Sequence, residues 1–216
     1  DADFPFLMLD TVDLECTRGE RLLFAGLAFT VQAGHCLHVA GENGAGKTSL
    51  LRILCGLLAP SHGEVRWGGA DIRRLREDYW QELAYVGHLN GVKDDLTALE
   101  NVRFAARLAG HPAGEEIARS ALELVGLAGF EHSQARFLSQ GQRRRIALGR
   151  LFLAREAKLW VLDEPFTALD VRGVAALATL IGEQLDRGGI VVLTTHQDVP
   201  VPGKVQRLEL HAAAVH

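Results

Sequence analysis

Residues 41–49 read G-E-N-G-A-G-K-T-S, and the first eight of them match the pattern G-x-x-x-x-G-K-[ST] in full. The glycines let successive backbone N–H groups surround phosphate oxygens without interference from side chains. The charge of Lys47 can reach the β- and γ-phosphates of a nucleotide, and the hydroxyl of Thr48 can bind Mg²⁺. The residues expected to hold a nucleoside triphosphate are Gly41, Glu42, Asn43, Gly44, Ala45, Gly46, Lys47, Thr48 and Ser49.

The segments on either side of this phosphate loop fit the same interpretation. Residues 36–40 form a short apolar run suited to a buried strand, and residues 49–58 repeat apolar side chains at helical spacing. A strand, a glycine loop and a helix in this order place the positive end of the helix dipole at the phosphates. The alternative is a glycine loop that only turns the chain, and the flanking strand and helix argue against it.

A second group of candidate residues follows a strand further along the chain. Residues 159–162 are consecutive apolar side chains, typical of a strand buried on both faces, and Asp163 and Glu164 come at its end. Ligands of open α/β sheets gather at such strand ends. We expect Asp163 to hold Mg²⁺ and Glu164 to act as the general base for the water that attacks the γ-phosphate. The alternative, two solvated acids, is disfavoured by the phosphate loop upstream.

A third motif, L-S-Q-G-Q at residues 138–142, lies between the other two. With all three motifs present, the chain resembles the ATP-binding cassette (ABC) ATPases over about residues 7–210. The resemblance implies ATP and Mg²⁺ as cofactors, and a head-to-tail homodimer in which this signature of one subunit closes over the ATP of the other. The residues that it assigns to the partner's ATP are Ser139, Gly141 and Gln142. Gln140 replaces the glycine of the commonest signature, at a position that varies in the family.

Two further motifs extend the resemblance. Asp170, in the T-A-L-D stretch, matches the loop that links the two ATP sites of the dimer. His196, in the T-T-H-Q stretch, matches the switch histidine that contacts the γ-phosphate. The resemblance therefore counts His196 among the catalytic residues, with Lys47 and Glu164. His196 also follows the β-branched apolar run at residues 190–194, so we expect it at a strand end.

The chain departs from the family at two positions in the nucleotide site. His88 stands where these ATPases carry a glutamine that senses Mg²⁺ and the γ-phosphate. Because a neutral imidazole can bind a metal or accept a hydrogen bond from water, we expect His88 to be a catalytic residue and a Mg²⁺ ligand. Arg18 stands near the aromatic residue that usually stacks on adenine. A guanidinium plane can stack on a base instead, and an ordinary solvated arginine is the equal alternative.

The segment around His88 narrows the resemblance to the cytochrome c maturation type, whose members are ATP-binding subunits of a haem exporter. The matching segments are residues 85–88 (Y-V-G-H), 91–102 (G-V-K-D-D-L-T-A-L-E-N-V), 141–151 (G-Q-R-R-R-I-A-L-G-R-L), 159–170 (L-W-V-L-D-E-P-F-T-A-L-D) and 188–197 (G-G-I-V-V-L-T-T-H-Q). The resemblance implies an ATPase of the haem-transporting translocase class. It would couple hydrolysis to haem export, or to release of a haem chaperone, through an integral membrane subunit. Haem would be involved only indirectly, since the sequence has no C-x-x-C-H attachment motif.

Composition limits the other functions. The net charge of −4 argues against nucleic acid as a partner, because proteins that bind it usually have a strongly basic face. The basic cluster at residues 143–145 is expected on a solvated helix face. Cys16, Cys36 and Cys55 are few and far apart, which favours a reducing compartment over a disulfide framework.

No stretch reaches the roughly 18 apolar residues needed to span a bilayer. We therefore expect a peripheral protein at the cytoplasmic face of the inner membrane, attached through its membrane partner. Two other functions stay open, namely the ATP-binding subunit of a transporter for another substrate and a non-transport ABC ATPase. The segment around His88 argues against the first. A single cassette without a linker or coiled coil argues against the second.

The predicted fold is an α/β P-loop NTPase fold of the ABC type, with an antiparallel β part and an inserted helical subdomain, in one domain over residues 1–216. The nucleotide-binding core comprises residues 1–87 and 156–216, and the helical subdomain comprises about 88–155. Residues 89–95, next to His88, are the expected docking surface for the membrane subunit.

The remaining elements are predicted from periodicity and turn residues. The expected strands of the antiparallel part are residues 7–14, 22–31 and 65–67. The expected helices are residues 79–83, 97–108, 115–125 and 142–154. Thr97 and Glu100, three residues apart, form a capping-box pattern at the start of the helix over 97–108.

Overall fold

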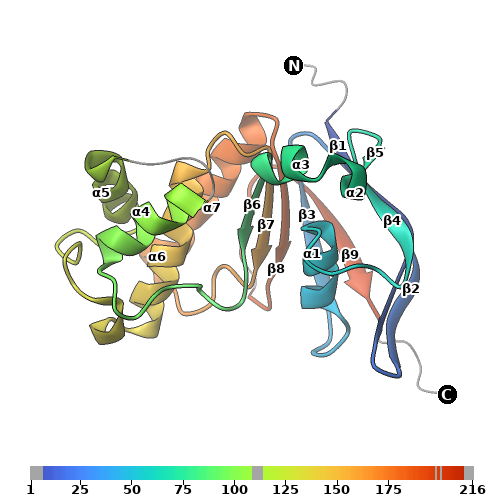
Figure 1. Ribbon diagram of the computed structural model, residues 1–216, viewed down its shortest axis with the longest axis horizontal. Helices are drawn as coiled ribbons and strands as arrows, with labels where there is room; N and C mark the ends of the chain where they lie inside the picture. Colours follow the sequence, from blue (N-terminus) through green and yellow to red (C-terminus); the bar gives the residue numbers. More distant parts are fainter. Residues whose placement is uncertain (1–6, 109–113, 198, 200, 212–216) are drawn as a thin grey trace.

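The computed structural model describes residues 7–108, 114–197, 199 and 201–211. Figure 1 shows an antiparallel sheet along one side of the molecule, a parallel sheet in the middle and a group of helices at the opposite end. This is the mixed α/β arrangement that the sequence predicted.

The antiparallel sheet has the strand order β2-β1-β4-β5. Its strands are β1 (Met8–Arg18), β2 (Arg21–Gln32), β4 (His62–Trp67) and β5 (Ala70–Asp71). β1 and β2 form a hairpin longer than predicted, and its turn passes through Gly19, whose φ of 61° suits a residue without a side chain. Leu9, Leu14 and Val31 are fully buried on the inner face of this sheet.

The parallel sheet has the strand order β6-β7-β8-β3-β9. Its strands are β3 (His35–Gly41), β6 (Leu83–Val86), β7 (Leu159–Asp163), β8 (Ile190–Thr194) and β9 (Lys204–Leu210). Every residue of β7 and β8 is buried, which explains why both strands are uninterrupted apolar runs in the sequence. Because the strands are parallel, β3, β7 and β8 end at the same edge of the sheet. The phosphate loop, Glu164 and the segment of His196 follow at that edge.

Helix α1 (Lys47–Leu54) follows the phosphate loop and lies between the two sheets (Figure 1). Its apolar residues, such as Leu50 and Ile53, are buried in a core to which both sheets contribute. The helix predicted over residues 49–58 ends earlier, because the chain turns at Gly56, which has a φ of 69°. Leu57 is therefore 61% exposed rather than part of the buried helix face.

Three more helices pack near the sheets, the first against β4 and β5 of the antiparallel sheet and the other two against the parallel sheet. These are α2 (Ile72–Leu75), α3 (Glu77–Gln81) and α7 (Val171–Asp186). The helix predicted over residues 79–83 is wrong at its end, since α3 stops at Gln81 and Leu83 already begins β6. α7 was not predicted, and its buried residues Leu177, Leu180 and Ile181 share a core with β7 and β8.

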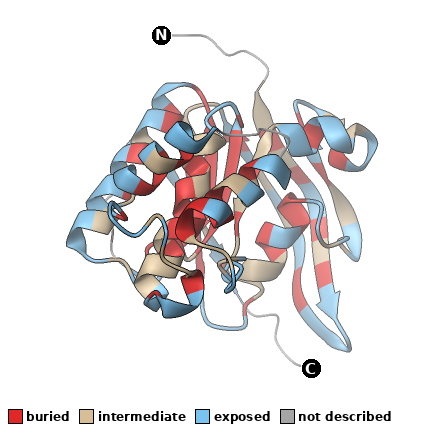
Figure 2. Cartoon of the chain, turned by 60° about the vertical axis from the view of Figure 1, so that its left-hand side comes forward, coloured by how far each residue is buried: buried red, intermediate tan, exposed pale blue. Residues whose placement is uncertain are grey.

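The far end of the molecule is formed by α4 (Ala98–Leu108), α5 (Glu115–Leu124) and α6 (Gln140–Leu153), with the short 3₁₀ helix η1 (Ala135–Phe137) before α6. The predicted capping box at α4 is confirmed, since the Thr97 amide donates to Glu100 at 2.8 Å and the Glu100 amide donates to Thr97 Oγ1 at 3.2 Å. The buried sides of these helices (red in Figure 2) surround a small apolar core of their own. No helix in the described ranges is long and apolar enough to cross a membrane.

Helix α6 belongs to two cores. Ile146 packs with α4 and α5, whereas Ala147 and Leu148 pack with the parallel sheet and α7. The prediction of a solvated basic face at residues 143–145 is therefore wrong at its middle position. Arg144 is only 4% exposed, because α6 is covered where it passes the ends of β6 and β7.

Candidate nucleotide site

The phosphate loop connects β3 to α1, and its glycines are required by the atoms packed around them. Gly41 has a φ of 138°, and a Cβ atom there would collide with the backbone carbonyl of Leu210. At Gly46, with a φ of 99°, a Cβ atom would lie 3.1 Å from the side chains of Leu23 and Phe24. No side chain caps the start of α1, so its first N–H groups remain for an anion.

A cavity of about 710 Å³ lies beside this loop. The predicted site residues that line it are Arg18, Asn43, Gly44, Gly46, Lys47, Thr48, Ser49, His88, Asp163, Glu164 and His196. Those that line it without having been predicted are Arg21, Leu23, Thr167 and Gln197. The fold thus brings the β1–β2 hairpin, the phosphate loop and the ends of β6, β7 and β8 to one cavity.

Lys47 lies across the phosphate loop. Its Nζ donates hydrogen bonds to the carbonyl oxygens of Gly41 and Glu42, at 2.6 and 3.1 Å. Both acceptors are neutral, and an ammonium group bonds more strongly to a charged phosphate oxygen. These contacts therefore keep Lys47 at the loop without neutralising its charge, and a phosphate oxygen can replace them.

Thr48 and Asp163 form a hydrogen-bonded pair that would hold Mg²⁺. Thr48 Oγ1 donates to Asp163 Oδ2 at 2.9 Å, and Thr194 Oγ1 donates to Asp163 Oδ1 at 2.8 Å. Within the described ranges, no cluster of three or more His, Cys, Asp or Glu side chains is arranged for a metal. A hydroxyl and one carboxylate fit Mg²⁺, which typically takes one or two protein oxygens and completes its shell with phosphate oxygens and water.

Glu164 lines the cavity and keeps one carboxylate oxygen without a partner. Its backbone is left-handed, with a φ of 50°, and its amide donates to Thr194 Oγ1 at 2.9 Å. Oε2 accepts a hydrogen bond from the backbone amide of His196 at 3.3 Å. Oε1 is buried and accepts no hydrogen bond from a described residue, although Nε2 of His196 lies 3.4 Å away. A carboxylate oxygen in this state is suited to take a proton from water.

His88 follows β6 and is exposed at the cavity. It also lines a second cavity of about 470 Å³, formed with Arg52, Leu57, Leu89 and Arg150. No described cluster joins His88 to two further metal-binding side chains. Its distinctive feature is its place between the nucleotide cavity and this second cavity.

The signature residues lie away from the cavity of their own chain. Ser139 caps α6 through a capping box that was not predicted, since its Oγ accepts from the Gln142 amide at 3.2 Å and its amide donates to Gln142 Oε1 at 2.9 Å. A Cβ atom at Gly141 would lie 2.5 Å from the carbonyl oxygen of Ala168. None of Ser139, Gly141 and Gln142 is among the residues that line the nucleotide cavity.

Asp170 ties the next loop to the signature helix. Its side chain accepts from the Gly173 amide at 2.8 Å at the start of α7, and forms an ion pair with Arg145 of α6 at 2.5 Å. The hydrogen bond from the Gly173 amide, followed by the contact with Arg145, lowers the pKa of Asp170. Asp170 therefore connects α6 to the loop at the end of β7.

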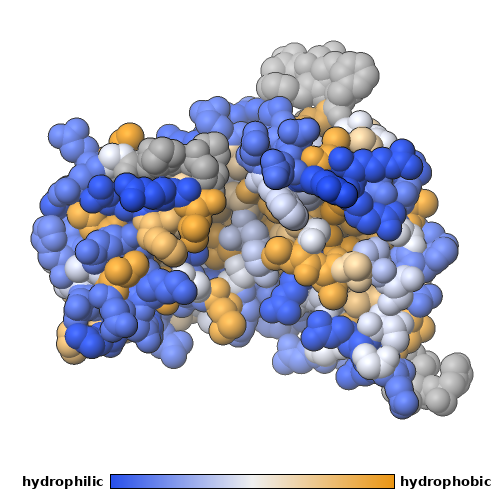
Figure 3. Space-filling view, in the orientation of Figure 1, coloured by the Kyte–Doolittle hydropathy of each residue, from blue (hydrophilic) through white to orange (hydrophobic). Residues whose placement is uncertain are grey.

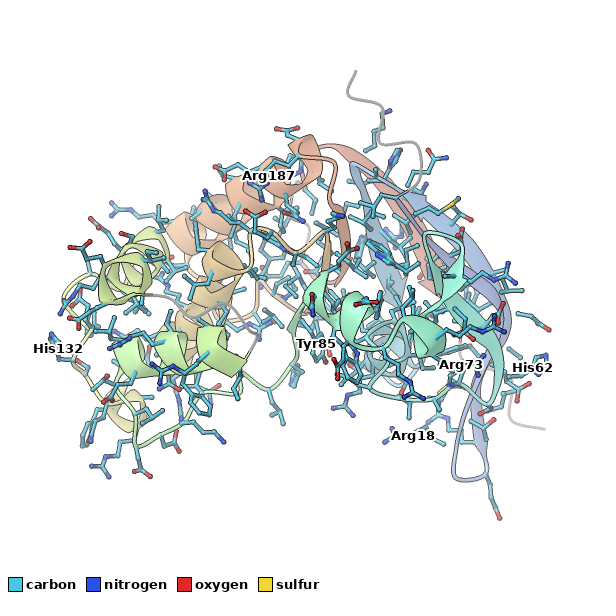
Figure 4. All side chains as sticks on the ribbon, turned by 45° about the horizontal axis from the view of Figure 1, so that its top comes forward. Arg18, His62, Arg73, Tyr85, His132 and Arg187 are labelled. Atoms are coloured by element: carbon cyan, nitrogen blue, oxygen red, sulfur yellow. The ribbon has the colours of Figure 1, made fainter. Side chains whose placement is uncertain are left out.

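Arg18 and Arg21 face the cavity from the end of the β1–β2 hairpin. They are paired across the hairpin, and Figure 4 shows Arg18 at that side of the molecule. The guanidinium of Arg21 lies near Gly44, 3.8 Å from where a Cβ atom would be. Arg21 was not predicted, although a hairpin turn at Gly19 places it opposite Arg18.

Comparisons with known proteins agree with this geometry. A family model described as ABC transporter matches residues 9–167. The chain is 53% identical over 195 residues to the cytochrome c biogenesis ATP-binding export protein CcmA of Nitrosomonas europaea, covering 90% of this chain and 91% of that protein. It is 50% identical over 204 residues to the protein of the same name from Haemophilus influenzae, covering 94% and 95%. The chain belongs to the CcmA family of ABC transporter proteins.

Solved structures of ABC proteins share the fold of this CcmA-family chain. The ATP-binding subunit of an ABC transporter aligns with a TM-score of 0.77 and 27% identity, over 88% of this chain and 79% of that one. An ABC transporter ATP-binding protein from Pyrococcus furiosus aligns with the same TM-score at 24% identity, over 93% and 97%, which shows the fold alone. The predicted ABC fold and the predicted cytochrome c maturation type are therefore confirmed.

Membership of the family makes this chain an ABC ATPase that binds ATP, as the phosphate loop predicted. The individual site residues stay predictions. Among them are His88 and Arg18, both of which line the nucleotide cavity.

Proposed function

We propose that this chain is the ATP-hydrolysing subunit of an ABC complex for c-type cytochrome biogenesis. It couples hydrolysis to haem export, or to release of a haem chaperone, through an integral membrane subunit, and it meets haem only indirectly. ATP hydrolysis is supported by one observation, namely that Glu164 and the Thr48–Asp163 pair line the same cavity as the phosphate loop. The names of the relatives, which are cytochrome c biogenesis export proteins, support the biological part.

The side chains in the cavity account for hydrolysis as follows. Lys47 exchanges its two carbonyl partners for the β- and γ-phosphates, because a charged acceptor is the stronger partner. Mg²⁺ held by Thr48 and Asp163 supplies positive charge at the phosphate oxygens. Oε1 of Glu164 takes a proton from water as the water oxygen bonds to the γ-phosphorus and the bond from that phosphorus to the β–γ bridging oxygen breaks. His196, 3.4 Å from Oε1, keeps that carboxylate in place and contacts the γ-phosphate.

A second copy of the chain completes the site in this proposal. Ser139, Gly141 and Gln142 do not line the cavity of their own chain. The capping box occupies the amides of Ser139 and Gln142, and the other backbone N–H groups in the first turn of α6 suit a phosphate. In a head-to-tail homodimer the signature of each copy closes over the ATP of the other. The ion pair between Asp170 and Arg145 then links α6 to the loop between the two sites.

Two cavity residues receive roles that other residue types fill in the general ABC pattern. We assign to His88 the sensing of Mg²⁺ and the γ-phosphate, and catalytic support at that position, because it reaches the nucleotide cavity from the end of β6. Arg18 stacks on the adenine base through its guanidinium plane. Arg21, close to Gly44, adds positive charge near the phosphates.

The proposed docking surface for the membrane subunit is the second cavity together with residues 89–95. Its rim carries exposed apolar side chains, with Leu57 61% and Leu89 81% exposed. On the face that Figure 3 presents, apolar side chains lie over both the helical end and the sheets. Since His88 lines this cavity and the nucleotide cavity, a partner here contacts the segment that faces the γ-phosphate.

In this proposal residues of about 88–155 act as a helical subdomain, and residues 1–87 and 156–216 act as the nucleotide-binding core. The three helices of this part have an apolar core of their own, which supports movement as a unit. The chain is then a peripheral protein at the cytoplasmic face of the inner membrane, attached through the membrane subunit.

The test of the proposed function is to trap the assembly with Glu164→Gln. This variant keeps the phosphate loop and removes the base, so it should bind MgATP and hydrolyse it at least about a hundredfold more slowly than the parent. It is purified from detergent-solubilised native membranes in MgATP, and the attached proteins and any haem absorbance are identified. Membrane proteins of cytochrome c maturation are the expected partners.

Other outcomes would replace parts of the proposal. Recovery of an unrelated permease would support a transporter for another substrate, and recovery of only soluble partners would support a non-transport ABC ATPase. Hydrolysis by Glu164→Gln at the parent rate would show that another group is the base.

A further inference from the structure

Arg144 is a buried arginine in the middle of α6, between the signature and the parallel sheet. It is 4% exposed. Its guanidinium donates four hydrogen bonds, and each terminal nitrogen makes two of them. All the acceptors are neutral oxygens, three from the backbone and one from an asparagine side chain. Within the described ranges Arg144 forms no ion pair. Its positive charge is therefore buried among neutral hydrogen-bond acceptors.

The two terminal nitrogens bind two different segments. Nη1 donates to the carbonyl of Gly87 at 2.8 Å and to Oδ1 of Asn90 at 3.0 Å, on either side of His88. Nη2 donates to the carbonyls of Asp163 and Glu164, at 2.7 and 2.9 Å. Because the guanidinium is planar and rigid, one side chain sets the spacing between the His88 segment and the turn that carries the carboxylates.

The turn held by Nη2 needs such support. Glu164 is left-handed, with a φ of 50°, a conformation that costs free energy in a residue with a side chain. Its amide is bound by Thr194 Oγ1 and its carbonyl by Arg144, so both sides of the strained residue are fixed. The direction of the Glu164 carboxylate depends on this backbone conformation.

The burial of Arg144 also affects the pKa of its guanidinium group. Desolvation lowers the pKa of Arg144, while the nearby carboxylates of Asp163 and Glu164 oppose that change. The guanidinium therefore lies behind the two carboxylates as a fixed positive charge.

A second arginine on the same helix binds the other end of the His88 segment. Nη2 of Arg150 donates to the carbonyl of Gly91 at 2.7 Å. Arg144 and Arg150 together hold residues 87–91 to α6 at both ends. Any shift of α6, which begins at the signature, is thus passed to the segment that carries His88.

We propose that Arg144 is a positioning residue that fixes the Glu164 carboxylate relative to His88 and ties both to the signature helix. This inference rests on the proposed function and adds to it a specific mechanical link between the signature and the catalytic turn. Arg150 serves the same link at Gly91. Lysine cannot replace Arg144, because one ammonium nitrogen with three donors cannot span the two pairs of acceptors.

The experiment compares Arg144→Lys with the parent in the complex purified with its membrane subunit. The kcat for ATP should fall about tenfold or more, with KM and the Kd for MgATP within about twofold of the parent values. Arg143→Lys is the matched control, since Arg143 is the neighbouring, partly exposed residue and pairs with Asp94 at the surface. It should keep the parent kcat. A merely structural residue would lower Tm or the fraction of protein that binds ATP and leave kcat per bound nucleotide unchanged.

A double-mutant cycle adds Asn90→Ala, which by itself tests the inference at a partly exposed residue. Asn90→Ala removes one of the four acceptors and should lower kcat about threefold, with no further loss in the Arg144→Lys background. A parent-level kcat for Arg144→Lys, or fully additive effects of the two variants, would overturn the inference. If the parent complex itself fails to hydrolyse ATP, the proposed function fails, and this inference fails with it.

Discussion

At the scale of single residues, the charged side chains of the nucleotide cavity differ in their hydrogen-bond partners. Among the described residues, Lys47 bonds only to backbone carbonyls, and Oε1 of Glu164 accepts no hydrogen bond. The carboxylate of Asp163, in contrast, is bound by Thr48 and Thr194. The first two groups are therefore free to exchange partners with ATP and water, whereas Asp163 is fixed in position.

Lys47→Ala tests the first of these groups. Removal of the ammonium should weaken MgATP binding about tenfold to a hundredfold, because a charge-assisted hydrogen bond to phosphate is lost. Isothermal titration calorimetry measures this change directly. The matched control is Lys204→Ala, on the exposed strand β9, which should bind like the parent. Equal loss in both variants would mean that net charge, rather than the position of Lys47, governs affinity.

The cysteines provide a pH-dependent test at the same scale. Cys16, Cys36 and Cys55 are all buried, and burial raises the pKa of Cys36 to about 12. A raised pKa keeps the thiol protonated below that pH, so at pH 8 Cys36 is almost entirely in its unreactive thiol form. Native protein should therefore not react with a thiol reagent at pH 8, and unfolded protein should react at all three cysteines. A fast-reacting thiol in the native chain would contradict this assignment.

At the scale of elements, α6 connects most of the site. It begins at the signature with the Ser139–Gln142 capping box, contacts the loop of Ala168 through Gly141, and binds Asp170 through Arg145. Further along the helix, Arg144 and Arg150 bind residues 87–91. One rigid helix therefore joins the signature, the loop after β7 and the His88 segment.

Two glycines of α6 give a contrast within one helix. A Cβ atom at Gly141 would lie 2.5 Å from the Ala168 carbonyl, whereas at Gly149 the nearest atoms lie at 3.7 Å, an ordinary contact. Gly141→Ala should lower the free energy of unfolding by about 1–3 kcal/mol and displace the loop of Ala168. Gly149→Ala should raise it by about 0.5–1 kcal/mol, because alanine favours a helix interior over glycine. Urea unfolding of both variants measures the difference, and equal changes would refute the close approach at Gly141.

The sequence predicted those elements whose signal lies within the element's own residues. β7 and β8 are uninterrupted apolar runs, and the capping box at Thr97 marks the start of α4, so both kinds of element were found. β9 was missed, because only its last residue, Leu210, is buried and its strand conformation depends on pairing with β3. α7 was missed although its apolar residues recur at helical spacing, a signal that was present and not used.

The site shows the same division. The phosphate loop, Asp163, Glu164 and His196 were predicted from local motifs at the ends of strands, and the fold brings residues of all of them to one cavity. The burial of Arg144 could not be predicted, since its acceptors come from two segments distant in the sequence, and only the packed fold brings them together. The position of Arg21 could not be predicted either, because its approach to Gly44 depends on how the hairpin lies over the phosphate loop.

At the scale of the whole molecule, two cavities share His88, and only the second of them is also lined by a residue of the helical end, Arg150 of α6. The first faces the phosphate loop, and the second opens beside Leu57 and Leu89. Since residues 87–91 line the second cavity, His88 among them also lines the first, and the segment is bound to α6, occupation of one cavity is expected to change the shape of the other. This arrangement makes the segment after His88 the natural contact for a partner that responds to ATP.

Lys93→Glu tests that contact. Asp94 and Asp95 form ion pairs with Arg143 and Arg136, whereas Lys93 forms none within the described ranges, and its backbone is held by hydrogen bonds with Asn101. The side chain is thus an exposed charge on a fixed backbone, available to an acidic group of the membrane subunit. Reversal of this charge should weaken assembly with the membrane subunit about threefold to tenfold and leave MgATP binding unchanged.

The matched control for this last variant is Lys204→Glu, which reverses a charge on β9, at the edge of the parallel sheet opposite to β6. Assembly is measured by copurification from detergent at increasing salt, because a lost surface ion pair should matter less as salt increases. If Lys93→Glu lost ATP binding, the segment would belong to the nucleotide site and not to the docking surface. If both variants weakened assembly equally, overall charge would explain the effect. Only a loss confined to Lys93→Glu connects the membrane subunit to the segment that carries His88.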